Sequence, residues 1–113
     1  MLAAALLAAA CVSAHAEDDG LATIHEWRKE AGRTCMSDHF HDGSGNGPTR
    51  KAAEAAAISS WASFTAFEYS NNWARYTLAG SRKMDCSQNG GDSWTCNVTA
   101  RPCKPAKAAR RVR

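Results

Sequence analysis

The sequence predicts an α+β fold in which one long central helix packs on a small, disulfide-bonded antiparallel sheet, with a short helix before them. Three observations predict it: an alanine-rich run that turns aromatic, two extended segments around an Asn-Gly pair, and four cysteines after the first 16 residues. At 113 residues the chain has the length of a single domain. A core of this size leaves little margin of stability, so disulfides would contribute substantially.

The central helix is predicted over residues 48–79. Pro48 suits its first position and Gly80 suits its C-terminal cap. Residues 70–72 (Ser-Asn-Asn) are three poor helix formers in a row, so we expect a kink there. The apolar side chains fall in two sectors of the helix, so we expect structure to cover both sides. The main sector holds Ile58, Trp61, Ala62, Thr65, Tyr69, Trp73, Tyr76 and Ala79, and the opposite one holds Phe64, Phe67 and Leu78.

The first residues are predicted to be a signal peptide, residues 1–16, because a short apolar run ends there in Ala-His-Ala. Lipidation at Cys11 is the alternative, but three alanines make a poor approach to that cysteine, so we favour simple cleavage after Ala16. No later segment is long and apolar enough to span a bilayer. We therefore expect a periplasmic or secreted protein, with residues 17–104 as its single domain and residues 105–113 as a disordered basic tail.

Removal of the signal peptide leaves four cysteines, and an even number in a short exported chain predicts two disulfides. Three pairings are possible. The predicted hairpin favours one of them, since Cys86 and Cys96 lie about equidistant from its Gly90-Gly91 turn and would face each other across the strands. Cys35 would then join Cys103. A zinc site made of these thiols is disfavoured because no close Cys-x-x-Cys pair occurs.

Several shorter elements surround the central helix. Thr23 and Glu26 match a capping box, which predicts a short helix that ends at Gly32. Side-chain alternation predicts a short strand over residues 35–41, and the Gly- and Asn-rich residues 42–47 are predicted to form a loop.

The hairpin is predicted from two extended runs, residues 81–87 and 93–101, that flank an Asn-Gly turn. On its second strand one face is expected to pack on the helix, and that face carries Trp94, Cys96, Val98 and Ala100.

The densest set of potential metal ligands lies in the first predicted strand. In a strand, His39 and His41 point to one side, close enough to share a transition metal such as Zn or Cu. Asp42 or His25 would supply a third ligand. The competing interpretation is a polar strand end whose histidines cap the loop or face water.

The same segment also resembles the first half of an EF-hand calcium loop, with Asp42, Ser44, Asn46 and Gly47 at positions 1, 3, 5 and 6. The match then fails, because position 12 is Ala53. A Gly- and Asn-rich loop that leads into the helix is the simpler explanation.

Glu68 lies at the edge of the aromatic sector, where burial would raise its pKa and suit it to general-acid chemistry. No second carboxylate or nucleophile is placed with it by spacing, and there is no Gly-x-Ser-x-Gly. A hydrogen bond to Asn72 is the simpler role. The sequence therefore does not predict an enzyme.

Charge is uneven along the chain, whose net charge is +3. Its C-terminal end carries six basic residues without an acid, so this tail could contact an anionic surface of the cell envelope. The alternative is a tail that only adds solubility, and nucleic acid is not expected as a partner in the periplasm. These residues are Arg101, Lys104, Lys107, Arg110, Arg111 and Arg113.

The later half of the sequence resembles a group of small exported bacterial proteins of unknown function, over roughly residues 35–104. The residues that carry the resemblance are Trp61, Tyr69 and Trp73, then Cys86, Trp94-Thr95-Cys96 and Ala100-Arg101-Pro102-Cys103, together with the His-x-His-x-Gly of residues 39–43. Ser70 stands where the group would have glycine. The resemblance implies no activity, ligand or catalytic residue.

The function expected from the sequence is that of an exported, disulfide-bonded binding or structural module. The alternative is a transition-metal-binding protein that uses His39 and His41.

Overall fold

The computed structural model describes residues 19–106, so the predicted signal peptide and most of the basic tail lie outside the described residues. Within them the α+β class is confirmed. In chain order the elements are η1 (Gly20–Ile24), β1 (Trp27–Glu30), β2 (Arg33–Met36), β3 (His41–Gly47), α1 (Arg50–Tyr69), η2 (Asn71–Trp73), η3 (Tyr76–Leu78), β4 (Gly80–Gln88), β5 (Trp94–Arg101) and β6 (Cys103–Pro105).

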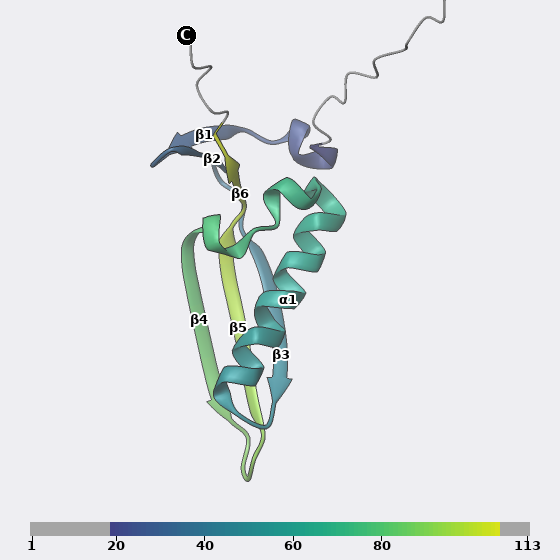
Figure 1. The fold of residues 1–113 in the computed structure, drawn as a ribbon, viewed down its shortest axis with the longest axis vertical. Coiled ribbons are helices and arrows are strands. Elements are labelled where there is room, and N and C mark those ends of the chain that lie inside the picture. The colour runs from purple at the N-terminus through teal and green to yellow at the C-terminus, as the bar shows by residue number, and fades with distance from the viewer. Residues whose placement is uncertain (1–18, 107–113) are drawn as a thin grey trace, which may run out of the picture.

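The strands form two antiparallel sheets instead of the expected one. Sheet A has the strand order β1-β2-β6, and sheet B has the order β3-β5-β4. Helix α1 runs along sheet B, whereas sheet A lies beyond the C-terminal end of that helix (Figure 1). The chain passes from sheet A to sheet B at residues 37–40 and returns at Pro102. Side chains at these two crossings therefore lie where the sheets meet.

Helix α1 is shorter than the predicted 48–79. Thr49 caps its start, where the hydroxyl accepts a hydrogen bond from the backbone N–H of Ala52. It ends at Tyr69 because Ser70 takes φ 88° and ψ 167°, a backbone conformation that cannot continue a helix. Two short 3₁₀ turns, η2 and η3, follow. The three poor helix formers at residues 70–72 thus end the helix and do not merely kink it.

Strand β3 occupies residues 41–47, of which the sequence predicts 42–47 as a loop, and this prediction was wrong. Its alternate glycines face α1 so closely that a Cβ on Gly43 would lie 2.4 Å from the carbonyl oxygen of Ala57. A Cβ on Gly45 would lie 2.4 Å from the backbone nitrogen of Ala57. These glycines therefore form the face of β3 that packs against α1, and the two backbones are almost in contact there.

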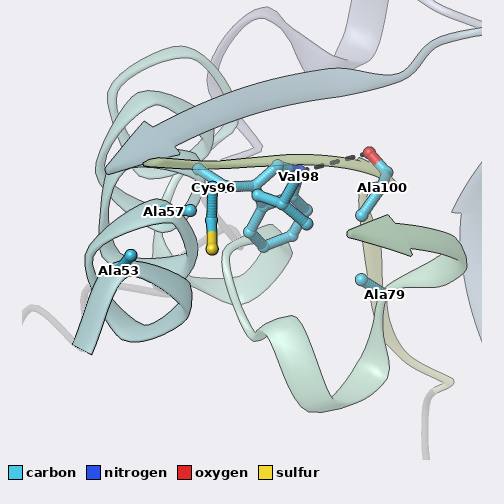
Figure 2. Close-up of a cluster of buried hydrophobic side chains, with 7 residues drawn as sticks. Ala53, Ala57, Ala79, Cys96, Val98 and Ala100 are labelled. Atoms are coloured by element: carbon cyan, nitrogen blue, oxygen red, sulfur yellow. Dashed lines mark hydrogen bonds between the residues drawn. The ribbon is translucent and has the colours of Figure 1, made fainter. Parts of the chain in front are cut away.

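The main core fills the space between α1 and sheet B, and Figure 2 shows it in close-up. Trp61 is fully buried, and its indole N–H donates to the carbonyl oxygen of Ala100 at 3.2 Å, which is the dashed line in Figure 2. The hairpin face that was predicted to meet the helix does so, with Cys96, Val98 and Ala100 buried. The core residues are Ala53, Ala57, Trp61, Ala79, Cys96, Val98 and Ala100.

The opposite side of the helix is not covered as predicted, since Phe64 is 45 % and Phe67 is 88 % exposed. The short N-terminal helix expected to cover it is absent, because Trp27–Glu30 pairs with β2 as a strand. Ala31 and Gly32 connect these strands, and both have positive φ, as a tight two-residue hairpin loop requires. Among the described residues before β1, the helical structure is the 3₁₀ turn η1.

Two disulfides join the strands in the pairing that the hairpin favours. Cys86–Cys96 links β4 to β5, and Cys35–Cys103 links β2 to β6. Both pairs are also direct partners in the strand registers. Each disulfide therefore holds two neighbouring strands of one sheet, one in sheet A and one in sheet B.

The two ends of the described chain meet at sheet A. Nζ of Lys104 forms an ion pair with Asp19 at 3.0 Å and lies over the rings of Trp27 and Trp73. The indole N–H of Trp73 donates to the same Asp19 carboxylate. Both charged side chains are only 12 % exposed, so this pair is shielded from water.

Within residues 19–106 there is no helix with the length and hydropathy needed to cross a membrane.

Candidate metal centre

Three side chains from separate parts of the chain converge where the two sheets meet. His39 lies in the crossing segment, His41 is the first residue of β3, and Glu68 stands one residue before the end of α1. One potential ligand atom from each of them lies within 4.8 Å of the other two. Two imidazoles and a carboxylate are a common ligand set for zinc and other transition metals. We call this group the His-His-Glu triad.

His41 is the buried member of the triad, with only 2 % of its surface exposed. Its ring stacks on Tyr69 at a centroid distance of 4.7 Å and contacts Phe64 at 4.6 Å. His39 and Glu68 are half-buried, so the triad opens to solvent on their side. The aromatic contacts limit the orientation of the His41 ring, which a ligand must keep.

Thr65 determines which nitrogen of His41 faces Glu68. The Thr65 hydroxyl donates its hydrogen to the carbonyl oxygen of Trp61 at 2.7 Å. Its oxygen lies 2.9 Å from Nδ1 of His41, so it accepts a hydrogen bond from an Nδ1–H. A neutral imidazole carries one hydrogen, so this arrangement leaves Nε2 with a lone pair.

Nε2 of His41 therefore faces the carboxylate of Glu68. It lies 3.2 Å from Oε2 of Glu68, yet it makes no well-aligned hydrogen bond to any described residue. Two electron-rich atoms at this distance repel unless a cation shares them. Either a proton or a metal ion would relieve the repulsion.

A proton is disfavoured at neutral pH because burial lowers the pKa of His41 below its ordinary value of 6.5. Glu68 opposes this shift, but His39 and His25 add to it. The ring is therefore neutral at pH 7, with its Nε2 lone pair directed toward Glu68. A metal ion shared by the two groups would satisfy both of them.

The spacing agrees with shared coordination. With bonds of about 2.1 Å in a tetrahedral site, a ligand nitrogen and a ligand oxygen lie about 3.4 Å apart. The observed distance between Nε2 of His41 and Oε2 of Glu68 is 3.2 Å. The rings of His39 and His41 have centroids 5.3 Å apart, close to the separation of about 5 Å expected for two imidazoles on one tetrahedral ion.

The structure brings together His39 and His41, as the sequence predicts, but it places Asp42 elsewhere. Because side chains alternate along β3, Asp42 projects from the face opposite to His41 and accepts a hydrogen bond from Thr99 at 2.7 Å. His25 lies next to the triad, with its ring stacked on His39 at 4.5 Å. The third member of the triad is thus Glu68, neither of the two residues expected from sequence.

Glu68 was missed as a ligand because it lies far from the histidines in sequence. No spacing rule connects a residue near the end of a helix to a strand that precedes that helix. The hydrogen bond to Asn72 that we expected is absent among the described contacts of Glu68, whose side chain pairs with His41 instead. The available signal was the helical sector of Thr65 and Tyr69, which both contact His41.

The EF-hand resemblance finds no support in the structure. Its would-be ligands lie along an extended strand, and two of them are bonded across the sheet: Asp42 to Thr99 and Asn46 to Thr95. An EF-hand needs a curved loop around the ion.

Lys104 was expected to contact an anionic surface together with the rest of the basic tail. Its ammonium group instead pairs with Asp19 and lies over two indole rings. Arg101 is also buried, with its guanidinium bonded to the carbonyl oxygens of Met36 and Ser37. The other members, Lys107, Arg110, Arg111 and Arg113, lie outside the described residues.

Comparison with protein-family models, with curated proteins and with solved structures found no match to this chain. The site must therefore be interpreted from its own geometry.

Proposed function

We propose that this protein is an exported, disulfide-stabilised binding module that holds a divalent transition-metal ion, Zn or Cu, at His39, His41 and Glu68. The observation that carries the proposal is the contact between Nε2 of the buried His41 and the half-buried Glu68 carboxylate, which lie 3.2 Å apart. A metal ion converts this repulsive contact into two bonds. Imidazole with carboxylate suits Zn and Cu better than Ca or Mg, which prefer oxygen ligands alone.

The surroundings of the triad support metal binding in a second way. In metal sites, a ligating histidine usually donates its other N–H to an oxygen, which fixes its tautomer and orientation. His41 does this with Thr65 at 2.9 Å.

Export is part of the proposal and rests on the predicted signal peptide, residues 1–16, together with the two disulfides. Disulfides persist in oxidising compartments. They also remove Cys35, Cys86, Cys96 and Cys103 from the set of available ligands, since a disulfide sulfur does not act as a thiolate. The metal is therefore held by nitrogen and oxygen donors alone.

We assign the ion a binding role and no catalytic one. His41 is screened by Tyr69 and Phe64, and the Thr65 hydroxyl beside it is already hydrogen-bonded to the carbonyl oxygen of Trp61. A resemblance to small exported bacterial proteins without known activity is consistent with this choice but adds no ligand.

The test is native mass spectrometry of the full chain expressed with its export signal and purified from the periplasm without chelator. We expect one Zn or Cu ion per chain, lost on treatment with chelator, lost in a His41→Asn variant and bound more weakly by a Glu68→Gln variant. Asp42→Asn is the matched control, because its carboxylate adjoins His41 in sequence but lies on the other face of β3. Protein that stays metal-free after incubation with excess Zn²⁺ and Cu²⁺, or Glu68→Gln protein that binds as tightly as wild type, would refute the proposal.

A further inference from the structure

A third histidine lies against the triad without a role in it. The ring of His25 stacks on His39 at a centroid distance of 4.5 Å and an angle of 29°, and it meets Tyr69 edge-on at 5.6 Å. Within residues 19–106 its ring nitrogens make no hydrogen bond and no ion pair. His25 is half-buried, so two nitrogen donors lie beside a candidate metal site with no other use for them.

The triad by itself leaves a tetrahedral ion one ligand short. Closed sites have four protein ligands, whereas sites with three keep a position for water or substrate. Tyr69 also touches the triad, but it does so with the face of its ring, which stacks on His41 at a centroid distance of 4.7 Å. Asp42 points away toward Thr99. His25 is the remaining donor whose ring contacts a member of the triad.

We propose that His25 is the fourth ligand, so that the bound ion is held by three imidazoles and one carboxylate in a closed site. This inference rests on the proposed function and specifies its coordination. The stack of His25 on His39 is the arrangement without metal, since two rings that lie face to face at 4.5 Å do not direct their lone pairs at one point. Two imidazoles bound to one ion have ring centroids about 5 Å apart. A rotation of the His25 side chain to that distance from the His39 ring would complete the site.

The backbone around His25 is already held near the site. The turn η1 packs on the end of α1 so closely that a Cβ on Gly20 would lie 2.6 Å from the carbonyl oxygen of Glu68. Ala22 is buried with Tyr69 and Trp73, and the backbone N–H of His25 donates to Ala22. Little loop entropy is therefore lost when His25 binds, because the segment is positioned before the metal arrives.

A closed site has a functional consequence. Its ligands come from four places: the segment before β1, the crossing at residues 37–40, the start of β3 and the end of α1. The ion would fasten the N-terminal segment to the rest of the molecule and would present no open position to a substrate. This coordination suits a carrier, store or sensor of metal and not a hydrolytic enzyme.

The test is electron paramagnetic resonance of the full chain loaded with one equivalent of Cu²⁺, in which hyperfine structure counts the coordinated imidazoles. We expect three imidazoles in the wild type and two in His25→Phe. Phenylalanine keeps the ring stack on His39 while removing both nitrogens, so a packing role alone would leave the count unchanged. We also expect His25→Phe to lower the affinity for the ion about 10- to 100-fold in a chelator competition.

The controls separate this inference from the function on which it rests. Glu68→Gln should lower the affinity but keep three imidazoles, and Glu26→Gln, an exposed neighbour of His25, should change neither quantity. A wild-type count of two, or a His25→Phe variant that matches wild type in count and affinity, overturns the role of His25 and leaves the triad standing. Failure of the wild type to bind Cu²⁺ or Zn²⁺ overturns the proposed function itself.

Discussion

The hydroxyl of Thr65 lies 2.9 Å from Nδ1 of His41, and this contact decides which nitrogen of the buried ring is left to face Glu68. The Thr65 hydroxyl donates its only hydrogen to the carbonyl oxygen of Trp61, so it can only accept a hydrogen bond from the imidazole. A threonine inside a helix thus sets the protonation of a histidine on a strand.

Replacing Thr65 by valine should weaken both folding and metal binding. The substitution keeps the shape of the side chain but leaves the buried Nδ1–H of His41 without an acceptor, which costs about 1–3 kcal/mol. Affinity for Zn²⁺ should fall about 10- to 100-fold, as for other outer partners of ligating histidines. Urea denaturation and chelator competition measure the two effects. Thr99→Val, which removes a half-buried hydroxyl on the far face of sheet B, should leave the affinity unchanged.

The metal-free protein should lose stability as the pH falls below 6.5. Burial lowers the pKa of His41 in the folded state, so the unfolded chain takes up a proton that the folded protein does not. The stability is complete above pH 6.5 and declines toward the folded-state pKa, by about 1.4 kcal/mol for each unit between the two values. Denaturation between pH 8 and 5 in the presence of chelator measures this slope.

His41→Asn should flatten that part of the pH profile, because asparagine offers Thr65 an N–H but does not titrate. An identical slope in wild type and variant would show that another group is responsible.

The hairpin and the helix could be predicted from sequence because their signals are local. An Asn-Gly turn between two extended runs and an amphipathic aromatic sector depend on near neighbours alone, and they placed Cys96, Val98 and Ala100 against the helix correctly. The cysteine positions followed from the same hairpin. These are the parts of the fold in which local preference and tertiary packing agree.

The predictions that were wrong concern segments whose structure depends on contacts with residues far away in the sequence. Residues 42–47 look like a loop by composition, yet a strand forms because Gly43 and Gly45 let α1 approach β3. The period of two in these glycines was the available signal. The segment from Thr23 was predicted as a helix from its capping box, but pairing with β2 overrides that preference. Likewise, no local pattern could bring Glu68 to His41, since only the packing of α1 on β3 does so.

Gly45→Ala should destabilise the protein by about 3 kcal/mol, because its methyl group would lie 2.4 Å from backbone nitrogen of Ala57 and would push α1 away from β3. Chemical denaturation measures the change. Ser44→Ala is the matched control: it adjoins Gly45 but projects from the exposed face, and it should change the stability by less than about 0.5 kcal/mol. Equal behaviour of the two variants would contradict the close approach of helix and strand.

Ser70→Gly should stabilise the protein by about 1 kcal/mol. Ser70 adopts φ 88° and ψ 167°, a region that is open almost only to glycine, and its buried hydroxyl has no hydrogen-bond partner among the described residues. Thermal and urea denaturation measure the gain. Ser63→Gly, an exposed position inside α1, should instead lose about 0.5–1 kcal/mol. A loss at Ser70 as large as at Ser63 would argue against the strained backbone.

The ion pair between Asp19 and Lys104 brings the first and nearly the last described residues within 3.0 Å of each other. Both ends of residues 19–106 thus leave the molecule beside sheet A, while the β4–β5 turn lies at the far end of sheet B (Figure 1). A short peptide could join these ends without crossing the fold, and new termini could be opened at the exposed Gly90-Gly91 turn. The topology of residues 19–106 therefore makes them a suitable scaffold for circular permutation, with the candidate metal centre left in the unbroken stretch from residue 19 to residue 90.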